Sequence, residues 1–487
     1  MATTQLQKRL KTRHLVMMSL GSAIGAGLFL GVGEGIAVAG PAILLAYVAA
    51  GLIIISVMRM LGEMVAADPN PGAFSYYAGK ALGPAAAFAV GWLWWVQLCL
   101  VVAVEATAAA QIMRSAFFPD VPQWIWVLAF MLIFTVINLM GVGSFGEFEY
   151  WFSFIKVAFV ILFLIVVTAF LFGLTPGESP GLSNVQGIDL APSGIGGIGT
   201  GLLIVIFAFG GIEILAVAAA ETADPETSIR KAIAGIVLRI LVFYMGSVTL
   251  MILAVRWDNP DLAENPFVTT LSTTGLPAVG TIMAIIIVVA LLSSLNANVY
   301  GASRMVFSLA HRGMAPAATG RANNRGVPIP AIMVSVLIGF ASVLVNAFNQ
   351  DNVLFIGLNV VGSTLLVTWI ATVASHIILR HRAERDGTPL PMKMWGYPVL
   401  SWLTAAALLA VIVLGMFAPD TRTQMLWTFG IFAIVWLIGV IVTRGKSVEE
   451  VTGGDELAPD EPHAVSYTHL TLPTTARRCR SRWSPYH

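Results

Sequence analysis

The sequence predicts an all-α polytopic membrane protein, and two observations carry this prediction. Hydrophobic residues make up 57% of the 487 residues and charged residues only 11%, whereas about 25% of the residues in a soluble domain are charged. The apolar residues also form runs of about 20, the length that a helix needs to cross a bilayer core. A net charge of +1 argues against a nucleic-acid partner, because such proteins carry concentrated basic patches.

Twelve such runs follow one another along the chain, and each is expected to be a transmembrane helix. Tryptophan opens the fourth run at Trp124 and the fifth at Trp151, as expected of residues that prefer the membrane interface. The twelve runs cover residues 15–37, 41–64, 85–113, 123–141, 151–173, 196–219, 232–255, 276–299, 330–348, 353–379, 398–418 and 424–443.

Lysine and arginine predict the orientation of these spans, because cytoplasmic loops are enriched in both. One side carries only Arg114, Arg256 and Arg422. The other side carries eighteen such residues: Lys8, Arg9, Lys11, Arg13, Arg59, Lys80, Arg230, Lys231, Arg304, Arg312, Arg321, Arg325, Arg380, Arg382, Arg385, Lys393, Arg444 and Lys446. We therefore expect a protein of the cytoplasmic (plasma or inner) membrane with both termini in the cytoplasm.

The chain divides into one long membrane domain and short flanking segments. Residues 1–14 are expected to be a cytoplasmic N-terminus, 15–445 the twelve-helix domain, and 446–464 an acidic cytoplasmic tail. Residues 465–487 (VSYTHLTLPTTARRCRSRWSPYH) change character abruptly, with four arginines and a lone cysteine. We expect this last segment to be sequence that is not native to the protein, and the alternative is a disordered tail.

Motifs of soluble enzymes are absent from the sequence. There is no GxxxxGK[ST] phosphate-binding loop, and the seven histidines do not show the HExxH spacing of a zinc site. We therefore expect a protein that is not an enzyme and that needs no cofactor.

Two glycine-rich segments interrupt the apolar spans, and they are the first candidates for a functional site. Residues 21–31 read GSAIGAGLFLG in the first span, and residues 207–221 read FAFGGIEILAVAAAE in the sixth. Interrupted helices at corresponding positions of two halves of a chain indicate the binding site of a transporter. An unwound turn frees N–H groups for a carboxylate and carbonyls for an ammonium group. The alternative is close helix packing, because Gly21/Gly25 and Gly27/Gly31 are GxxxG pairs.

Charged residues inside the spans are the second set of candidates. Glu213 directly follows the second glycine break, where its carboxyl could bind a proton, act as a gate, or cap freed N–H groups. Lys156 either extends to the interface or points into the bundle, where its ammonium would take the place of a coupling cation. Glu105 lies among small residues, which favours a tight helix contact with the carboxyl directed toward a cavity. Weaker candidates, since such residues often join helices, are Asn296 and Asn298 in the eighth span and Asn359, Ser363 and Thr364 in the tenth.

A pair of opposite charges lies near the cytoplasmic end of the second span. Arg59 and Glu63 are four residues apart, a spacing that suits an ion pair on one helix face. We expect the pair to serve structure or cytoplasmic gating.

With these segments in view, the chain resembles the amino acid permeases of the amino acid–polyamine–organocation superfamily, in particular the bacterial amino acid transporter family. The resemblance covers roughly residues 8–445. The motifs that carry it are GSAIGAGLFLG, AGPAILLAY, MRMLGEM with GAFSYYA, FGEFEYWFSFIKV, FAFGGIEILAVAAAET with PETSIRKAI, and ASRMVFSLAHRGMAP with RGVP. It implies a LeuT-like fold in which spans 1–5 and 6–10 are inverted repeats, followed by two C-terminal helices. It also implies proton-coupled uptake of an amino acid by alternating access.

The resemblance also assigns roles to individual residues. The substrate carboxylate would meet N–H groups near Ala26 and Gly27, and the amino group would meet carbonyls of both breaks. Lys156 matches a lysine that stands in for sodium, and Glu213 matches a gating acid that could sense protons. The positions implied for substrate binding are Ser22, Ala23, Ile24, Gly25, Ala26, Gly27, Phe207, Ala208, Phe209, Gly210 and Gly211, with Glu105 beside them.

One departure from the family pattern bears on the substrate. Many relatives carry a hydroxyl residue between the two glycines where this chain has Ala26, so one donor to the carboxylate is missing. Permeases for 4-aminobutyrate are similar here, and they share the glutamate of VEATAAA and the MWGYP segment. We therefore expect a small neutral or ω-amino acid, with 4-aminobutyrate as the best candidate. The alternatives are proline, alanine or serine, an aromatic amino acid, or a nutrient sensor on the same fold that does not transport.

Overall fold

The computed structural model describes residues 12–21, 24–70, 72–140, 142–220, 222, 224–276, 279–348, 353–417 and 419–452. Every regular element within these ranges is a helix, so the prediction of an all-α protein is confirmed. The segments expected as the last part of the acidic tail and as residues 465–487 lie outside the described residues.

The helices follow the expected apolar runs closely, and proline opens five of them, since its fixed φ and missing N–H suit the first helical position. Helices that are not α-helical carry the label η. In chain order they are α1 (Thr12–Gly21), η1 (Gly27–Gly31), α2 (Val32–Ala39), η2 (Gly40–Ala42), α3 (Ile43–Ala67), α4 (Ala73–Leu82), α5 (Pro84–Ala116), α6 (Gln123–Met140), α7 (Val142–Leu171), α8 (Gly194–Ala208), α9 (Ile214–Ala220), α10 (Pro225–Arg239), η3 (Ile240–Gly246), α11 (Ser247–Ala254), α12 (Pro260–Glu264), α13 (Pro266–Ser272), α14 (Val279–His311), η4 (Ala317–Gly320), α15 (Ile329–Phe348), α16 (Val353–Arg385), α17 (Val399–Met416), α18 (Pro419–Val442) and α19 (Val448–Thr452).

Nine helices of the described residues are long and apolar enough to cross a membrane. The expected sixth and seventh spans contain only shorter apolar helices, Gly194–Ile206 and Val242–Ala254. The first expected span is divided too, and its second part runs on into the second span as one apolar stretch, Gly27–Ala67. Twelve spans and the inverted repeat therefore stay predictions. Three expected spans, the first, sixth and seventh, are therefore not among the nine as separate helices. In each of them the helix is broken or partly π-helical.

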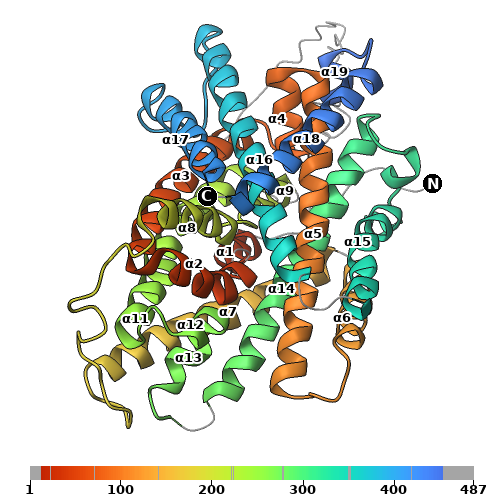
Figure 1. Ribbon diagram of the computed structural model, residues 1–487. Coiled ribbons are helices and arrows are strands. Elements are labelled where there is room, and N and C mark those ends of the chain that lie inside the picture. The colour runs from red at the N-terminus through yellow and green to blue at the C-terminus, as the bar shows by residue number, and fades with distance from the viewer. Residues whose placement is uncertain are drawn as a thin grey trace, which may run out of the picture.

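Both glycine-rich segments interrupt their helices, as predicted. In the first, α1 ends at Gly21 and η1 begins at Gly27, and the described residues Ile24 and Gly25 between them are not helical. In the second, α8 ends at Ala208 and α9 begins at Ile214. The two breaks lie together near the middle of the molecule, where α2 packs on α8 and α1 contacts α9 (Figure 1).

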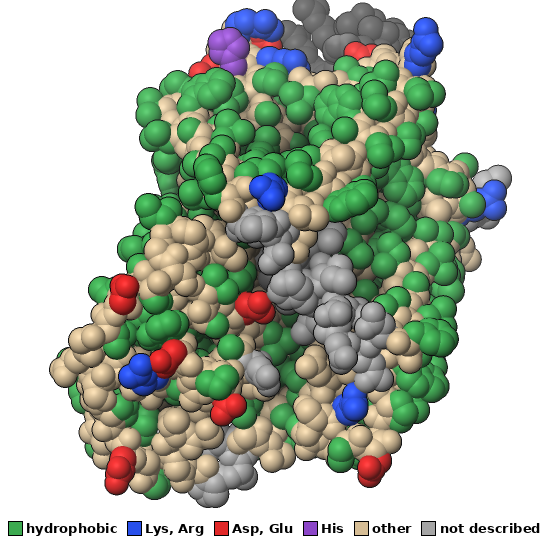
Figure 2. Space-filling view, in the orientation of Figure 1, with side chains coloured by type: hydrophobic (Ala, Val, Ile, Leu, Met, Phe, Trp, Pro, Cys, Tyr) green, Lys and Arg blue, Asp and Glu red, His purple; other side chains and the backbone are tan. Residues whose placement is uncertain are grey.

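The remaining helices separate into an inner and an outer set. In α5 and α16, 72% and 78% of the most apolar stretch is buried within the protein, but only 28% in α17 and 17% in α18. Hydrophobic side chains such as Trp402, Trp427 and Leu437 are therefore exposed on the outer helices. Figure 2 shows one face on which hydrophobic side chains cover much of the surface, as expected where helices meet lipid.

Candidate functional site

A small cavity lies where the two helix breaks meet α5 and α14. Its volume is about 20 Å³, which is room for about one water molecule. It is lined by Gly25, Gly27, Gln97, Val101, Glu105, Ala208, Gly210, Gly211, Ser294, Asn298 and Val361. Six of these eleven residues belong to the predicted substrate site. An amino acid is larger than this cavity, so binding one requires a side chain of the lining to move.

Glu105 joins α5 to the first break and to α14. The N–H of Ala26 donates to both carboxylate oxygens, at 3.2 and 3.3 Å, and the hydroxyl of Ser294 donates to Oε1 at 2.8 Å. The side chain is buried, with 3% of its surface exposed. Glu105 was expected either to add polarity to the substrate site or to form a hydrogen bond between helices. The contacts fit both interpretations, because Glu105 binds Ala26 of the first helix break and Ser294 of another helix.

Two amide oxygens of the lining have no hydrogen-bond partner among the described residues. They are Oε1 of Gln97 on α5 and Oδ1 of Asn298 on α14, and both side chains are buried. Nδ2 of Asn298 donates to the carbonyl of Ser294 at 2.8 Å. This hydrogen bond fixes the orientation of the Asn298 amide and so the direction of Oδ1. Such an acceptor is costly to bury unpaired, by about 1–3 kcal/mol. A donor on a ligand would satisfy it.

Sequence reasoning missed Gln97 and Ser294 as site residues. A signal for Gln97 was present, because Gln97, Val101 and Glu105 are spaced four apart and so share one helix face. A comparable signal was present for Ser294, because it lies in the polar segment SSLNAN and precedes Asn298 by four residues, on the same face of α14.

Lys156 points into the bundle and does not extend to the membrane interface. Its side chain is fully buried, and Nζ donates to the carbonyls of Gly21 at 2.7 Å and Ile24 at 3.1 Å. These carbonyls belong to the end of α1 and to the break, so the ammonium holds α7 against the interrupted helix. Among the described residues, no group of three or more His, Cys, Asp or Glu side chains is placed to bind a metal ion.

Glu149 is a second buried charge of α7 that the sequence analysis did not single out. Its Oε1 accepts hydrogen bonds from the hydroxyls of Ser153 at 3.3 Å and Ser293 at 3.0 Å. It precedes Lys156 by seven residues, two helical turns, so both lie on the same face of α7. That spacing was the signal that could have found it.

Glu213 lies within the second break and binds two N–H donors. The N–H of Gly211 donates to Oε2 and the indole Nε1 of Trp369 to Oε1, both at 2.8 Å. The carboxylate therefore caps the unwound turn and also ties it to α16. The role of Glu213 in proton sensing or gating is untested and stays a proposal.

Other predicted residues lie beside the cavity or outside the described part of the chain. Phe209 does not line the cavity, but packs against Tyr47 and Tyr244 with ring centroids 6.0 and 4.9 Å away. The Tyr244 hydroxyl donates to the carbonyl of Ala208 at 2.9 Å, which supports the end of α8. Ser22, Ala23 and the side chain of Phe207 are not described.

Residues 14–449 match the family model "Amino acid permease", which covers most of the chain. The chain belongs to this family. The permease is 40% identical over 460 residues to a gamma-aminobutyric acid permease of Bacillus subtilis, covering 94% of this chain and 98% of that relative. An aromatic amino acid transport protein of Corynebacterium glutamicum is 42% identical over 441 residues, or 89% and 95% of the two chains. A probable GABA permease of Pseudomonas aeruginosa is 37% identical over 441 residues, or 90% and 93%.

The predicted resemblance is thus confirmed, and the relatives are transporters of amino acids, not enzymes. Membership of this transporter family and the long apolar helices together show that the permease is a multi-pass membrane protein.

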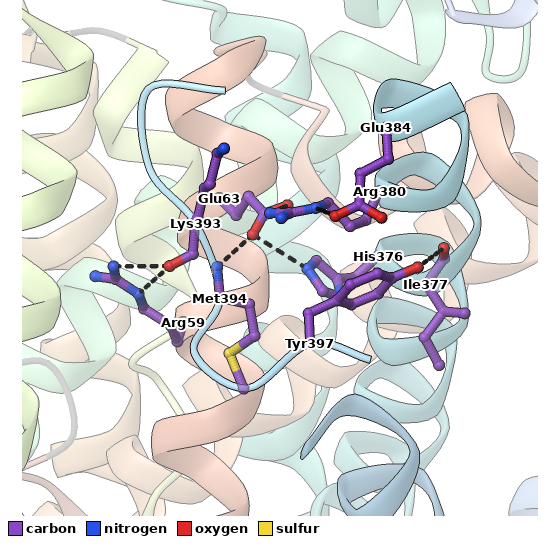
Figure 3. A network of polar contacts seen from close by, with 9 residues as sticks. All are labelled: Arg59, Glu63, His376, Ile377, Arg380, Glu384, Lys393, Met394 and Tyr397. Carbon is purple, nitrogen blue, oxygen red and sulfur yellow. Dashed lines mark hydrogen bonds and ion pairs between the residues drawn. The ribbon is translucent and has the colours of Figure 1, made fainter. Parts of the chain in front are cut away.

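A second polar cluster of the permease lies at the end of the bundle where Arg59, Arg230, Arg380 and Arg382 gather, here called the arginine-rich end. The predicted ion pair between Arg59 and Glu63 is wrong, because among the described residues each binds another partner (Figure 3). Arg59 donates to the carbonyl of Lys393 at 3.1 and 2.8 Å. Glu63 accepts from the N–H of Met394 and pairs with Arg380 at 3.1 Å. The segment after α16 supplies backbone partners that the helix spacing could not show.

The rest of this cluster lies on α16 and just after it. Nε2 of His376 lies 3.4 Å from Oε2 of Glu63, and the Tyr397 hydroxyl donates to the carbonyl of Ile377 at 3.5 Å (Figure 3). A tyrosine hydroxyl is protonated at neutral pH, and burial raises the pKa of Tyr397 further. The cluster thus ties α3, α16 and the following segment together.

The substitution Glu63→Gln is expected to destabilise this end of the permease. It removes the charge partner of Arg380 in a place where Glu63 is 2% exposed, and breaking a buried ion pair costs about 3–5 kcal/mol. The measurement is thermal unfolding of the purified protein, which should show a clearly lower midpoint.

Glu384→Gln is the matched control, because Glu384 also pairs with Arg380, at 2.8 Å, but its side chain is 48% exposed. Exposed pairs contribute about 0–1 kcal/mol, so its midpoint should stay near that of the wild type. Equal shifts in the two variants would contradict the distinction between the buried and the exposed carboxylate.

Proposed function

We propose that the permease is a proton-coupled symporter of the cytoplasmic membrane that imports a small neutral or ω-amino acid by alternating access. The best candidate substrate is 4-aminobutyrate. In this proposal twelve spans cross the membrane, spans 1–5 and 6–10 are inverted repeats, and both termini and the arginine-rich end face the cytoplasm.

One observation carries this proposal: the cavity between the two breaks offers opposite polar chemistry on its walls. The hydroxyl of Ser294 on the wall, and the N–H of Ala26 between the lining residues Gly25 and Gly27, are donors that already hold a carboxylate, that of Glu105. The oxygens of Gln97 and Asn298 are acceptors without a partner among the described residues. Donors suit the carboxylate of a zwitterion, and amide oxygens suit its ammonium group.

The amide oxygens favour an ω-amino acid over an aromatic one. A ring placed against Gln97 and Asn298 would leave both acceptors unpaired, at about 1–3 kcal/mol each. An ammonium group at the far end of a short chain would satisfy them. The relatives include both a gamma-aminobutyric acid permease and an aromatic amino acid transport protein. The argument for 4-aminobutyrate therefore rests on the chemistry of the residues that line the cavity.

Lys156 is the residue that we propose for proton coupling. Its ammonium donates to two carbonyls around the first break, which is the place that a coupling cation would take. Loss of the proton would remove the charge that holds α7 to this break. Protonation and the position of the interrupted helix would then be linked.

The experiment is uptake of labelled 4-aminobutyrate into proteoliposomes with an imposed pH gradient. We expect accumulation when the gradient is present and loss of it when the gradient is collapsed. Competition by unlabelled proline, alanine, serine and tryptophan then ranks the alternative substrates. Stronger competition by tryptophan than by 4-aminobutyrate would contradict the substrate, and no uptake of any amino acid would favour the sensor.

The substitution Gln97→Leu tests the acceptor role within the same assay. Losing an acceptor for a charged group costs about 1.5–3 kcal/mol, so the KM for 4-aminobutyrate should rise by roughly 10- to 100-fold. Gln111→Leu is the matched control, because Gln111 lies on the same helix but is exposed. An unchanged KM in Gln97→Leu would remove Gln97 from the site.

A further inference from the structure

We propose that Glu105 is an internal occupant of the carboxylate subsite, which the carboxylate of the substrate must displace in order to bind. This inference rests on the proposed function, since it assigns a role to a residue of the same site. It predicts that the carboxyl of Glu105 opposes substrate binding, although the residue lines the cavity.

The contacts of Glu105 are those that a bound carboxylate would make. Both of its oxygens accept from the N–H of Ala26, within the first helix break, and Oε1 accepts from Ser294. Frayed helix turns of this kind bind carboxylates through their free N–H groups. The hydroxyl of Ser294 also supplies, from α14, the side-chain donor that Ala26 lacks.

The subsite has no room for a second carboxylate. A Cβ on Gly25 would lie 2.5 Å from Oε1 of Glu105 and 2.9 Å from Oγ of Ser294, so the carboxyl lies directly against the backbone of the break. The cavity beside it measures about 20 Å³, which is room for about one water molecule and too little for a second carboxylate group. The two carboxylates therefore compete for the same donors.

Two roles of Glu105, competition with the substrate and direct binding of the substrate, predict opposite changes in substrate affinity when its carboxyl is removed. If Glu105 occupies the subsite, removing its carboxyl frees the donors and strengthens substrate binding. If Glu105 instead binds the ammonium group of the substrate, removing it weakens binding. The affinity of a Glu105 variant thus decides between the two roles.

The test is binding of 4-aminobutyrate to purified Glu105→Ala, measured by calorimetry. We expect the Kd to fall about tenfold below that of the wild type. We also expect acetate, a carboxylate without an ammonium group, to compete with 4-aminobutyrate in Glu105→Ala and not in the wild type. Val101→Ala is the matched control, because it enlarges the same cavity from the same helix and keeps the carboxyl; acetate should not compete there.

Glu105→Gln keeps the shape of the side chain and serves if the alanine variant does not fold. It is a weaker occupant without charge, so binding should still tighten and acetate should still compete. Weaker binding of 4-aminobutyrate to these variants, together with no competition by acetate, would overturn the occupant role of Glu105. The proposed function would still stand in that case, provided that the wild type takes up the substrate. If the wild type bound no amino acid, the proposed function would fail, and direct binding of acetate to Glu105→Ala would still test the occupant role.

Discussion

Replacing Lys156 with methionine is expected to abolish accumulation of the substrate under a pH gradient. Methionine is similar in length but has no charge, and it leaves the carbonyls of Gly21 and Ile24 without the donor that binds both. The carbonyl of Gly21 keeps the hydrogen bond from the N–H of Ile24 at 3.0 Å, whereas the carbonyl of Ile24 loses this donor, and an unpaired buried carbonyl costs about 1–3 kcal/mol. The contact that links α7 to the first break would be lost, and with it the group that exchanges the proton. Uptake into proteoliposomes with and without the gradient measures this effect.

Lys80→Met is the matched control for this experiment. Lys80 pairs with Asp68 at the arginine-rich end, and its side chain is 39% exposed, so its loss should leave accumulation near the wild-type level. Exchange of labelled for unlabelled substrate separates coupling from folding: any exchange that Lys156→Met retains should not depend on external pH. Accumulation in Lys156→Met at the wild-type level would refute the coupling role.

The two helix breaks and Lys156 could be predicted because their residue types are unfavourable in the apolar helices that surround them. Glycine is unfavourable in a helix, and a lysine in an apolar span is costly, so both stand out in the sequence without any partner. The physical reason for the break became visible only in three dimensions. Gly25 is in contact range of Glu105 and Ser294, which come from helices far away in the chain.

The polar partners could not be predicted to the same extent, because an uncharged side chain in an apolar helix has several common roles. Ser294 bonds Glu105, but a serine in a span often bonds only its own helix. Arg59 and Glu63 show the opposite error, since the spacing rule considers only partners on one helix. Their partners, the backbone atoms of Lys393 and Met394, arrive from more than 300 residues away.

The glycines of the first span show where packing and function separate. A Cβ on Gly21 would lie 2.1 Å from Oγ of Ser153, so close contact with α7 explains this residue. A Cβ on Gly31 would lie 3.7 Å from Cγ2 of Ile204, an ordinary contact that does not require glycine. The GxxxG pattern treats both alike, because it records spacing and not the distance to the facing helix.

The substitution Gly27→Ala is expected to disrupt the site, whereas Gly31→Ala in the same π-helical segment is expected to be tolerated. A Cβ on Gly27 would lie 2.4 Å from Cα of Ala208, and a backbone atom of the facing helix cannot rotate away. The two breaks would have to move apart, at about 1–3 kcal/mol for an overpacked contact. At Gly31 the added methyl group meets no such obstacle and gains up to about 1 kcal/mol of helix propensity.

Gly27→Ala should therefore lower the midpoint of thermal unfolding, whereas Gly31→Ala should raise it slightly or leave it unchanged. The affinity for 4-aminobutyrate should fall only in Gly27→Ala, because only there do the walls of the cavity separate. Calorimetry on both purified variants measures this difference. A normal affinity in Gly27→Ala would mean that the close approach of the breaks is not needed for binding, and the placement of the substrate between them would then fail.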